Sequence, residues 1–392
     1  MSQPINSLKN SRDLSLDAFR GITFLVMIFV NLASSVKGLP NGINHMPADF
    51  DGMSLADIVF PCFLFIVGMS IPFSINSRIA KGDGIVKLQA HIAYRAFALI
   101  VMGFYMVNTE DGYNEKAMGI SINLWAMIFY AAALLTWGVY RFKTPFINYA
   151  LRAAGVATII VLGAIYRSGP DGGGWMVPEW WGILGCIGWA YLFACIGYQV
   201  ARGRILLLAA LVAGCAGYYA FSRTFGLNEV ISMHITHTSI VLCGVVCALL
   251  FFDVKKERTS TQRFIHAAAF AFFLALVATL LHCFYIISKI GATPPWALYC
   301  GAIAVAVFML LYWLINIRQR STWVAVVEPA ASNPLITYLI PHVVDCIIRY
   351  FSLAWPAFLI KGNVGILFAI AYAFAVIGLV SIMNKFNFKL KI

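Results

Sequence analysis

The sequence is poor in charged residues. Only 11% of its 392 residues are Asp, Glu, Lys or Arg, whereas soluble domains carry roughly a quarter. Because 61% of the residues are hydrophobic, a soluble globule of this size would lack the polar surface to cover itself, so lipid must solvate much of the apolar excess. The same composition excludes a disordered or collagen-like chain. It predicts an integral membrane protein.

Motifs typical of disulfide, metal and repeat proteins are also missing. The nine cysteines lie in apolar runs without a CxxC pair, so we expect packing residues rather than metal ligands. There is no evident internal repeat, and we expect no cleavable signal peptide before the first apolar run. The longest polar stretches are too short to form a domain. We therefore expect one integral-membrane domain over residues 1–392, with 1–15 as a short cytoplasmic N-terminal segment.

Long apolar runs predict the fold class. Crossing about 30 Å of hydrocarbon takes roughly 20 residues of helix, and twelve runs qualify. They are residues 16–36, 54–75, 90–108, 120–140, 146–166, 182–200, 204–222, 235–252, 265–289, 295–315, 334–354 and 363–383. We expect an all-α polytopic protein of ten to twelve membrane helices. Short connections between residues 146 and 222 leave a merged or re-entrant pair open.

The basic residues predict the orientation. If the N-terminus is cytoplasmic, well over half of the 28 Lys and Arg fall in loops that face inward. This bias supports cytoplasmic N- and C-termini. It also explains the net charge of +12 through topology and attraction to anionic lipid, so we expect no nucleic-acid partner.

Charged residues at the inner ends of the first and third spans form one candidate site. Asp17 and Arg20 are three apart on one helix face, and Arg95 lies at a similar depth. One acid and two arginines leave spare positive charge, which suits a phosphate-bearing ligand from the cytoplasm. The alternatives are a self-satisfied ion pair for Asp17 and Arg20, and a lipid contact for Arg95.

Polar residues at the outer ends of the first two spans form a second candidate site. If the first span runs out from the cytoplasm and the second span returns, Asn31 and Asp57 lie at the same depth, with His45 in the loop between them. A carboxylate that orients a histidine raises its basicity, so this group is a plausible general base. The alternative is an exposed, inactive histidine.

Other histidines give weaker signals. His234 and His237 are three apart at the outer start of the eighth span, where we place them near the extracytoplasmic substrate. They can bind zinc, but the spacing indicates no third ligand, so we expect no metal site. We interpret His282 as an interior hydrogen-bonded residue. His342 and Asp345 line a polar cavity or satisfy each other.

Three ordered motifs resemble a known family. They are SLDAFRGITFLVMIFVN, NHMPADFDGMSLADIVFPCFLFIVGMSIPFS and AYRAFALIVMGFYMVN, and they are similar to the heparan-alpha-glucosaminide N-acetyltransferase family and its bacterial relatives. Weaker similarity continues in EWWGILGCIGWAYLF, ATPPWALY and NPLITYL. The resemblance implies acetyl transfer from cytoplasmic acetyl-CoA, across the membrane, to a sugar or glycan on the other side. It also implies a homodimer. Because we expect neither a luminal domain nor a signal peptide, and the chain resembles the bacterial branch, we expect a bacterial cytoplasmic (inner) membrane.

The resemblance also implies residue roles. The family's active-site histidine falls on His45, its nearby asparagine on Asn31 and its aspartate on Asp57, while its opening acid and arginine fall on Asp17 and Arg20.

Further donor contacts fall in the other matching stretches. Besides Arg95, we expect Trp296 and Asn333 to contact acetyl-CoA, although an interfacial anchor and a helix cap explain these two as well. Phosphates at Arg20 and Arg95 would place the acetyl end, roughly 20 Å away by chain reach, near His45.

Two mechanisms stay open at this stage. In one, His45 deprotonates the acceptor amine or hydroxyl, with Asp57 orienting the ring and Asn31 donating to the thioester oxygen. In the other, His45 carries the acetyl group transiently. A proton-coupled secondary transporter of a small sugar or organic anion is the main alternative function. A glycan-binding scaffold without catalysis is a second.

Overall fold

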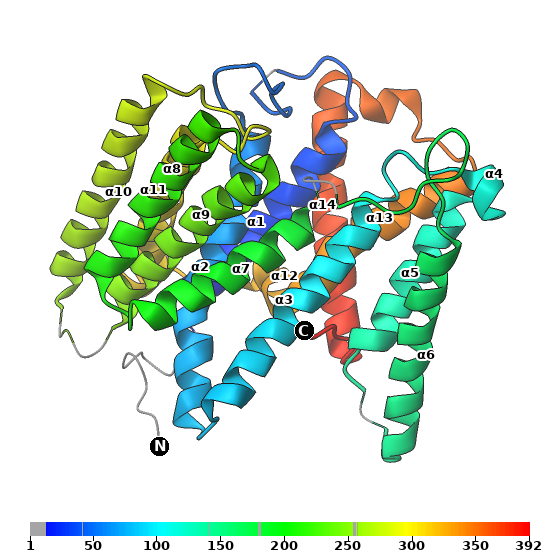
Figure 1. Cartoon of the computed structure of the whole chain (residues 1–392), viewed down its shortest axis with the longest axis horizontal. Helices are drawn as coiled ribbons and strands as arrows, with labels where there is room; N and C mark the ends of the chain where they lie inside the picture. Colours follow the sequence, from blue (N-terminus) through cyan, green and yellow to red (C-terminus); the bar gives the residue numbers. More distant parts are fainter. Residues whose placement is uncertain (1–12, 41, 141, 179–181, 254–255, 257) are drawn as a thin grey trace.

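The computed structural model describes residues 13–392 except 41, 141, 179–181, 254, 255 and 257, so most of the predicted segment 1–15 lies outside the described residues. The described chain is helical (Figure 1). Its helices are α1 (Leu14–Ala33), α2 (Leu55–Ala80), α3 (Ile85–Val107), α4 (Glu115–Met118), α5 (Ile122–Trp137), α6 (Pro145–Ile165), α7 (Ile183–Val200), α8 (Ile205–Phe225), α9 (Glu229–Phe252), α10 (Ser260–His282), α11 (Pro294–Tyr312), the π-helical η2 (Trp313–Ile317), α12 (Val324–Ser332), α13 (Pro334–Tyr350), the 3₁₀-helical η3 (Ala357–Ile360) and α14 (Gly362–Lys385).

Side chains cap the starts of the first two helices. Asp13 accepts hydrogen bonds from the backbone N–H groups of Ser15 and Leu16 at the start of α1. Ser54 caps α2, and Asp57 bonds back to the Ser54 backbone, which completes a capping box. Such caps satisfy N–H groups that have no partner inside the helix. The second helix therefore starts at a defined residue, directly after the loop of residues 34–54, which we call the His45 loop.

The all-α fold class is confirmed, and the number of spans is at the low end of the expected range. In the described part of the chain, ten helices are long and apolar enough to cross a membrane, or eleven if α12 and α13 form one bent span. Each of the twelve predicted runs falls on a helix. However, α5 has 16 residues, about 24 Å at the helical rise, which is short of the hydrocarbon thickness.

The structure contains a sharply bent pair of helices, but not in the region where the sequence left a merged or re-entrant pair open. Residues 146–222 form three separate helices, α6, α7 and α8. The break lies instead between α12 and α13, which meet at an angle of 85°. Asn333 and Pro334 lie at this corner, and a proline at the first position of α13 prevents the chain from continuing α12 without a bend.

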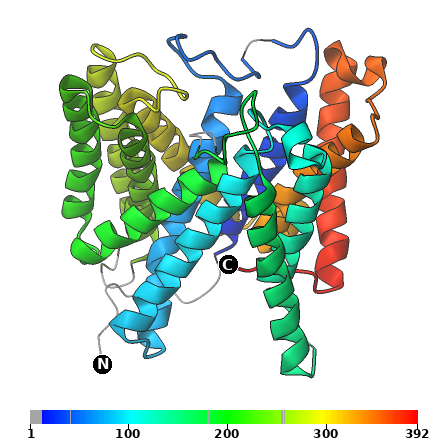
Figure 2. The same cartoon turned by 45° about the vertical axis from the view of Figure 1, so that its right-hand side comes forward.

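The helices form two groups around a central set (Figures 1 and 2). Helices α8, α10 and α11 lie on one side with α9, while α5, α6, α13 and α14 lie on the other. Helices α1, α2, α3 and α7 run between these groups. Every residue of α9 from Thr236 to Phe252 is buried, so α9 belongs to the protein core rather than to the lipid-facing surface.

Two glycines allow α2 and α9 to approach closely. A Cβ atom at Gly68 would lie 1.9 Å from the carbonyl oxygen of Val241, and one at Gly244 would lie 2.0 Å from the carbonyl oxygen of Phe65. Only hydrogen fits at either position, and membrane helices use such small residues to bring backbones together. This contact fixes α2, whose first turn carries Asp57, against the most buried helix.

We predict that Gly68→Ala destabilises the protein. The added methyl group meets backbone atoms that cannot move independently, so the loss should be about 1–3 kcal/mol. Thermal unfolding in detergent measures it. Gly214→Ala in α8 is the matched control, because nothing lies within 4 Å of a Cβ atom there. Equal melting temperatures for the two variants would contradict the close contact.

Candidate functional site

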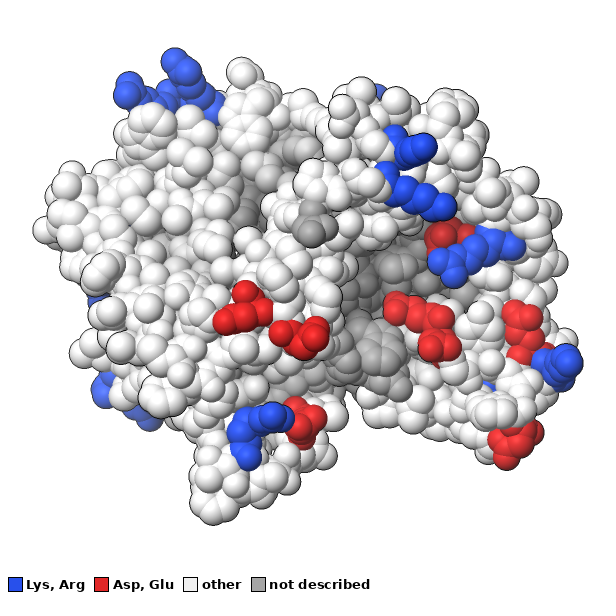
Figure 3. All heavy atoms as spheres, turned by 90° about the horizontal axis from the view of Figure 1, so that it is seen from above, with Lys and Arg blue, Asp and Glu red and all other residues white. Residues whose placement is uncertain are grey.

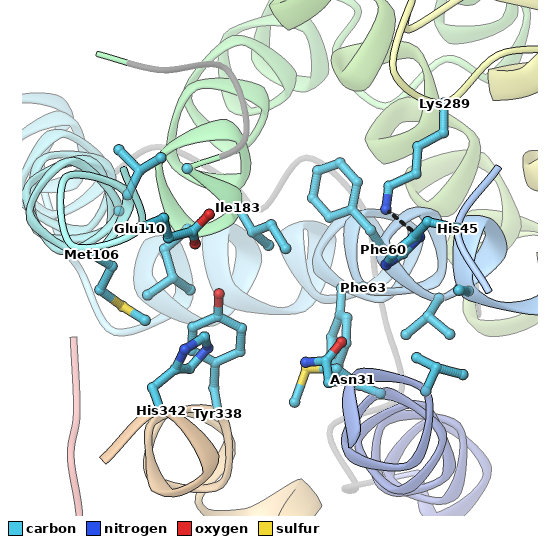
Figure 4. Close-up of a pocket in the computed structure, with 18 residues that line it drawn as sticks. Asn31, His45, Phe60, Phe63, Met106, Glu110, Ile183, Lys289, Tyr338 and His342 are labelled. Atoms are coloured by element: carbon cyan, nitrogen blue, oxygen red, sulfur yellow. Dashed lines mark hydrogen bonds between the residues drawn. The ribbon is translucent and has the colours of Figure 1, made fainter. Parts of the chain in front are cut away.

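A pocket opens at the end of the molecule that carries the His45 loop, and the space between its walls is about 650 Å³ with the adjoining open solvent included. Helices α1, α2, α3, α7 and α13 line it, together with four connecting segments that contribute His45, Glu110, Gly182 and Lys289 (Figure 4). Seen from that end, most of the described surface carries neither acidic nor basic side chains, and the acidic ones lie on both halves of the view (Figure 3).

His45 and Asp57 form the predicted pair in this pocket. The Nδ1 atom of His45 lies 2.9 Å from Oδ1 of Asp57. The other carboxylate oxygen, Oδ2, accepts from the backbone N–H groups of Met46 and Ser54 and from the Ser54 hydroxyl. Asp57 is 1% exposed, whereas the His45 side chain is 43% exposed. The carboxylate is therefore fixed, and it holds a ring whose other edge is accessible.

The His45 loop is held by a second segment, residues 283–293. The side chain of Asp51 accepts from the Ile287 backbone N–H at 2.8 Å and pairs with Nε2 of His282 at 2.9 Å. The Ser288 hydroxyl donates to the Ala48 carbonyl at 2.9 Å. The Ile287 hydrogen bond, followed by that of His282, lowers the pKa of Asp51. The predicted hydrogen bonding of His282 is confirmed, but its interior position is wrong, because the side chain is 35% exposed at the end of α10 and anchors this loop.

Lys289 from the same segment completes the site and was missed from the sequence. Its Nζ lies 3.1 Å from Nδ1 of His45 and 3.9 Å from Oδ1 of Asp57. Its side chain is 16% exposed, and this burial lowers the pKa of Lys289, opposed by the Asp57 carboxylate. In the sequence, Lys289 is one of several basic residues in the predicted outer loops. No residue near it along the chain indicates a contact with His45.

The contacts of Lys289 define two states of the imidazole. Nδ1 carries either one hydrogen or one lone pair, so it forms a hydrogen bond with one neighbour at a time. With hydrogen on Nδ1, His45 donates to Asp57 and leaves Nε2 as a base. With hydrogen on Nε2, Lys289 donates to Nδ1 and Nε2–H becomes a donor. In one tautomer Nε2 is therefore a base, and in the other it is a hydrogen-bond donor.

The remaining polar groups lie across the pocket. Asn31 of α1 lies on the His45 side, and Glu110, Tyr338 and His342 form the facing wall (Figure 4). Burial raises the pKa of Glu110, opposed by Arg349. The alternative that His342 lines a cavity is thus confirmed, while Asp345 pairs with Arg349 at 2.9 Å. Sequence reasoning missed Glu110 and Tyr338, although Glu110 follows directly after α3.

The predicted donor-binding arginines lie at two helix interfaces. Arg20 donates to Asp17 at 3.0 Å and to Ser70 of α2 at 3.2 Å. The guanidinium of Arg95 stacks on the Tyr191 ring of α7, 5.0 Å from its centre. On α1 the pocket lining begins at Met27, about 10 Å along the helix from Arg20.

Trp296 and Asn333, the other predicted donor contacts, are buried outside the pocket lining. The Trp296 Nε1–H donates to the Asp57 backbone carbonyl at 3.2 Å, so this ring supports the first turn of α2. The Asn333 amide donates to the Asn384 side chain at 3.1 Å and to the Phe388 carbonyl at 2.9 Å. Asn333 therefore ties the α12–α13 corner to the end of α14.

His234 and His237, predicted to contact substrate, also lie outside the pocket lining. His237 packs edge-on against Phe60, a pocket residue, at 5.1 Å between ring centres. Both histidines come together with Cys186 of α7, and the nitrogen and sulfur atoms that they offer lie within 4.8 Å of one another. Cys186 could not be connected to them by spacing, because it lies on a different helix.

The fold and the pocket define a polytopic membrane protein with a carboxylate–histidine site. No protein-family model matches the chain. Heparan-alpha-glucosaminide N-acetyltransferase of Homo sapiens is 40% identical over 94 residues, and that of Mus musculus is 38% identical over 93 residues. Each match covers 24% of this chain and 13% of the relative. The resemblance to this acetyltransferase family is confirmed over that quarter of the chain.

We predict that Asp51→Asn loosens the His45 loop. The neutral amide loses the charge-assisted contacts to Ile287 and His282, so amide hydrogen exchange across residues 34–54 should accelerate. Because the contacts lower the pKa of Asp51, they stabilise the docked loop above the ordinary value of 3.8 and are lost as the pH falls through the lowered pKa. Asp49→Asn, in the same loop, is the control. Unchanged exchange in Asp51→Asn would show that the loop is held by other contacts.

Proposed function

We propose that the protein is a transmembrane acetyltransferase that moves an acetyl group from cytoplasmic acetyl-CoA to an extracytoplasmic sugar. One observation carries the proposal: an accessible imidazole is held by a buried carboxylate inside a pocket that also contains an amide donor. The acetyltransferase relatives support the reaction class.

In the proposed reaction, Nε2 of His45 removes a proton from the acceptor amine or hydroxyl. The acceptor nitrogen or oxygen then bonds to the acetyl carbon, and the thioester oxygen gains negative charge. The side-chain N–H of Asn31 stabilises this charge. When the carbon–sulfur bond breaks, the coenzyme A thiolate leaves and takes the proton from His45. Asp57 holds the ring throughout and stabilises its charged form.

The facing wall of the pocket suits a sugar. Glu110 and Tyr338 offer a carboxyl and a hydroxyl group on the side opposite His45 (Figure 4). These groups bind sugar hydroxyls or an amino group, while the Phe60 and Phe63 rings provide the apolar surface that sugar rings pack against. We propose that the acceptor lies between this wall and His45.

The donor is proposed to enter from the opposite end of α1. Arg20 and Arg95 supply positive charge for the phosphates, and the acetyl end then extends toward Met27 and the pocket. The edge-on pair of Phe24 and Phe63, 4.6 Å between ring centres, joins α1 to α2 in this region. Cytoplasmic termini, a bacterial inner-membrane location and a homodimer are part of the same proposal, based on the charge bias and the resemblance.

We predict that His45→Ala abolishes acetyl transfer while leaving acetyl-CoA binding measurable, because the variant lacks the base but keeps the arginines. Acceptor-dependent release of free coenzyme A from purified protein measures transfer, and a transporter would not show it. His266→Ala, an exposed histidine in α10, should retain full activity. Transfer by His45→Ala at the wild-type rate would refute the catalytic assignment.

We predict that Lys289→Met changes the pH dependence of transfer. Methionine keeps the length of the side chain but lacks the ammonium group beside Nδ1 of His45, so the variant removes one titrating group from the site. Burial lowers the pKa of Lys289, so any alkaline limb that reports its deprotonation should vanish in the variant. Lys116→Met, at an exposed position of α4, is the control. Superimposable profiles for Lys289→Met and wild type would exclude this role.

A further inference from the structure

A second cluster of chemically active side chains lies outside the pocket, where α7 packs against α9. We propose that Cys186, His234 and His237 bind a transition-metal ion, with Zn²⁺ as the ion that best fits the donor set. This inference is independent of the proposed acetyl transfer, because none of the three residues lines the pocket.

The geometry of the three residues fits one metal ion. His234 and His237 are three residues apart on one face of α9, and Cys186 comes from the first turn of α7. Their nitrogen and sulfur atoms lie within 4.8 Å of one another. In a tetrahedral zinc site, bonds of about 2.1 Å to nitrogen and 2.3 Å to sulfur place these atoms roughly 3.4–3.7 Å apart. Small side-chain rotations close that difference.

The histidines have unsatisfied polar atoms at this place. Nδ1 of His234 and Nδ1 of His237 are both buried and have no hydrogen-bond partner among the described residues. His237 is 1% exposed, and it is enclosed edge-on by Phe60 at 5.1 Å and Trp296 at 6.0 Å. A buried polar atom without a partner is costly and calls for an explanation. Metal coordination supplies that partner for an imidazole that cannot turn toward water.

The donor types select the metal. One thiolate and two imidazoles suit Zn²⁺ and related borderline ions, while Mg²⁺ and Ca²⁺ require oxygen ligands. Three protein ligands leave one tetrahedral position for a water molecule. Binding requires the Cys186 thiolate, so the thiol proton is released to solvent when the ion enters.

The bound ion would hold α7 against α9 beside the pocket. Ile183 and Leu184 of α7 and Phe60 of α2 line the pocket, and Phe60 packs on His237. The ion lies behind this wall rather than in it. We therefore assign it a structural role, in which it fixes the wall and does not touch the acetyl donor or the acceptor.

Metal analysis of the purified full-length protein tests the proposal. We expect stoichiometric zinc in the wild type and loss of that zinc in Cys186→Ser and in His237→Gln. Cys195→Ser is the matched control, because Cys195 is also buried in α7 but is not part of the cluster. It should retain wild-type zinc. Wild-type zinc no higher than in Cys186→Ser would overturn the proposal.

A second measurement on the wild type does not depend on the folding of any variant. Protein grown with Co²⁺ should show a thiolate-to-cobalt charge-transfer band and the visible bands of tetrahedral cobalt. Removal of the metal with a chelator should lower the melting temperature, and Zn²⁺ should restore it. A cobalt spectrum without the thiolate band would show that Cys186 is not a ligand and would overturn the assignment of the site.

Discussion

The candidate site depends on one buried charge. The carboxylate of Asp57 is 1% exposed, and a charge at such a position is tolerated only when it is paired and hydrogen-bonded. Its position at the third residue of α2 supplies the Ser54 contacts through the helix cap, and Met46 and His45 supply the rest. The requirement to satisfy this carboxylate therefore places the imidazole, folds the loop back on the helix and draws the Lys289 ammonium toward both.

The loop that carries the proposed base is supported by a distant segment of the chain. Residues 283–293 hold the His45 loop through Asp51 and Ala48 and also bring in Lys289. Trp296, at the start of α11, then supports the Asp57 backbone from inside the helix bundle. The start of α11 thus supports Asp57, and the connection before it contacts His45. The proposed base lies on a loop, but contacts from helix ends hold its position.

The helices and the Asn31–His45–Asp57 group could be predicted from the sequence for the same reason. Both depend on residues that are near one another along the chain. Hydropathy identifies each membrane helix by itself, and a hairpin necessarily joins the outer ends of its two helices. Lys289, Glu110 and Cys186 could not be assigned in this way, because their roles depend on which distant helices are neighbours. Hydropathy does not contain that information, since every lipid-compatible helix looks alike in it. The short α5 and the corner at Asn333 show the same limit, because protein contacts rather than lipid solvate them.

The proposed acetyl transfer requires the donor to reach the pocket from the end of α1 that carries Arg20. The pocket lining on α1 begins at Met27, and the predicted phosphate-binding Arg20 lies about 10 Å further along that helix. Between them, the Phe24 and Phe63 rings meet edge-on. Side chains change rotamers far faster than packed helices rearrange. A thin donor arm would therefore need the displacement of side chains such as Phe63, while the Gly68–Val241 contact keeps α2 on α9 and the carboxylate–imidazole pair keeps its geometry. In the proposed path, backbone contacts thus hold α2, which carries Asp57, while side chains control access of the donor to the proposed base.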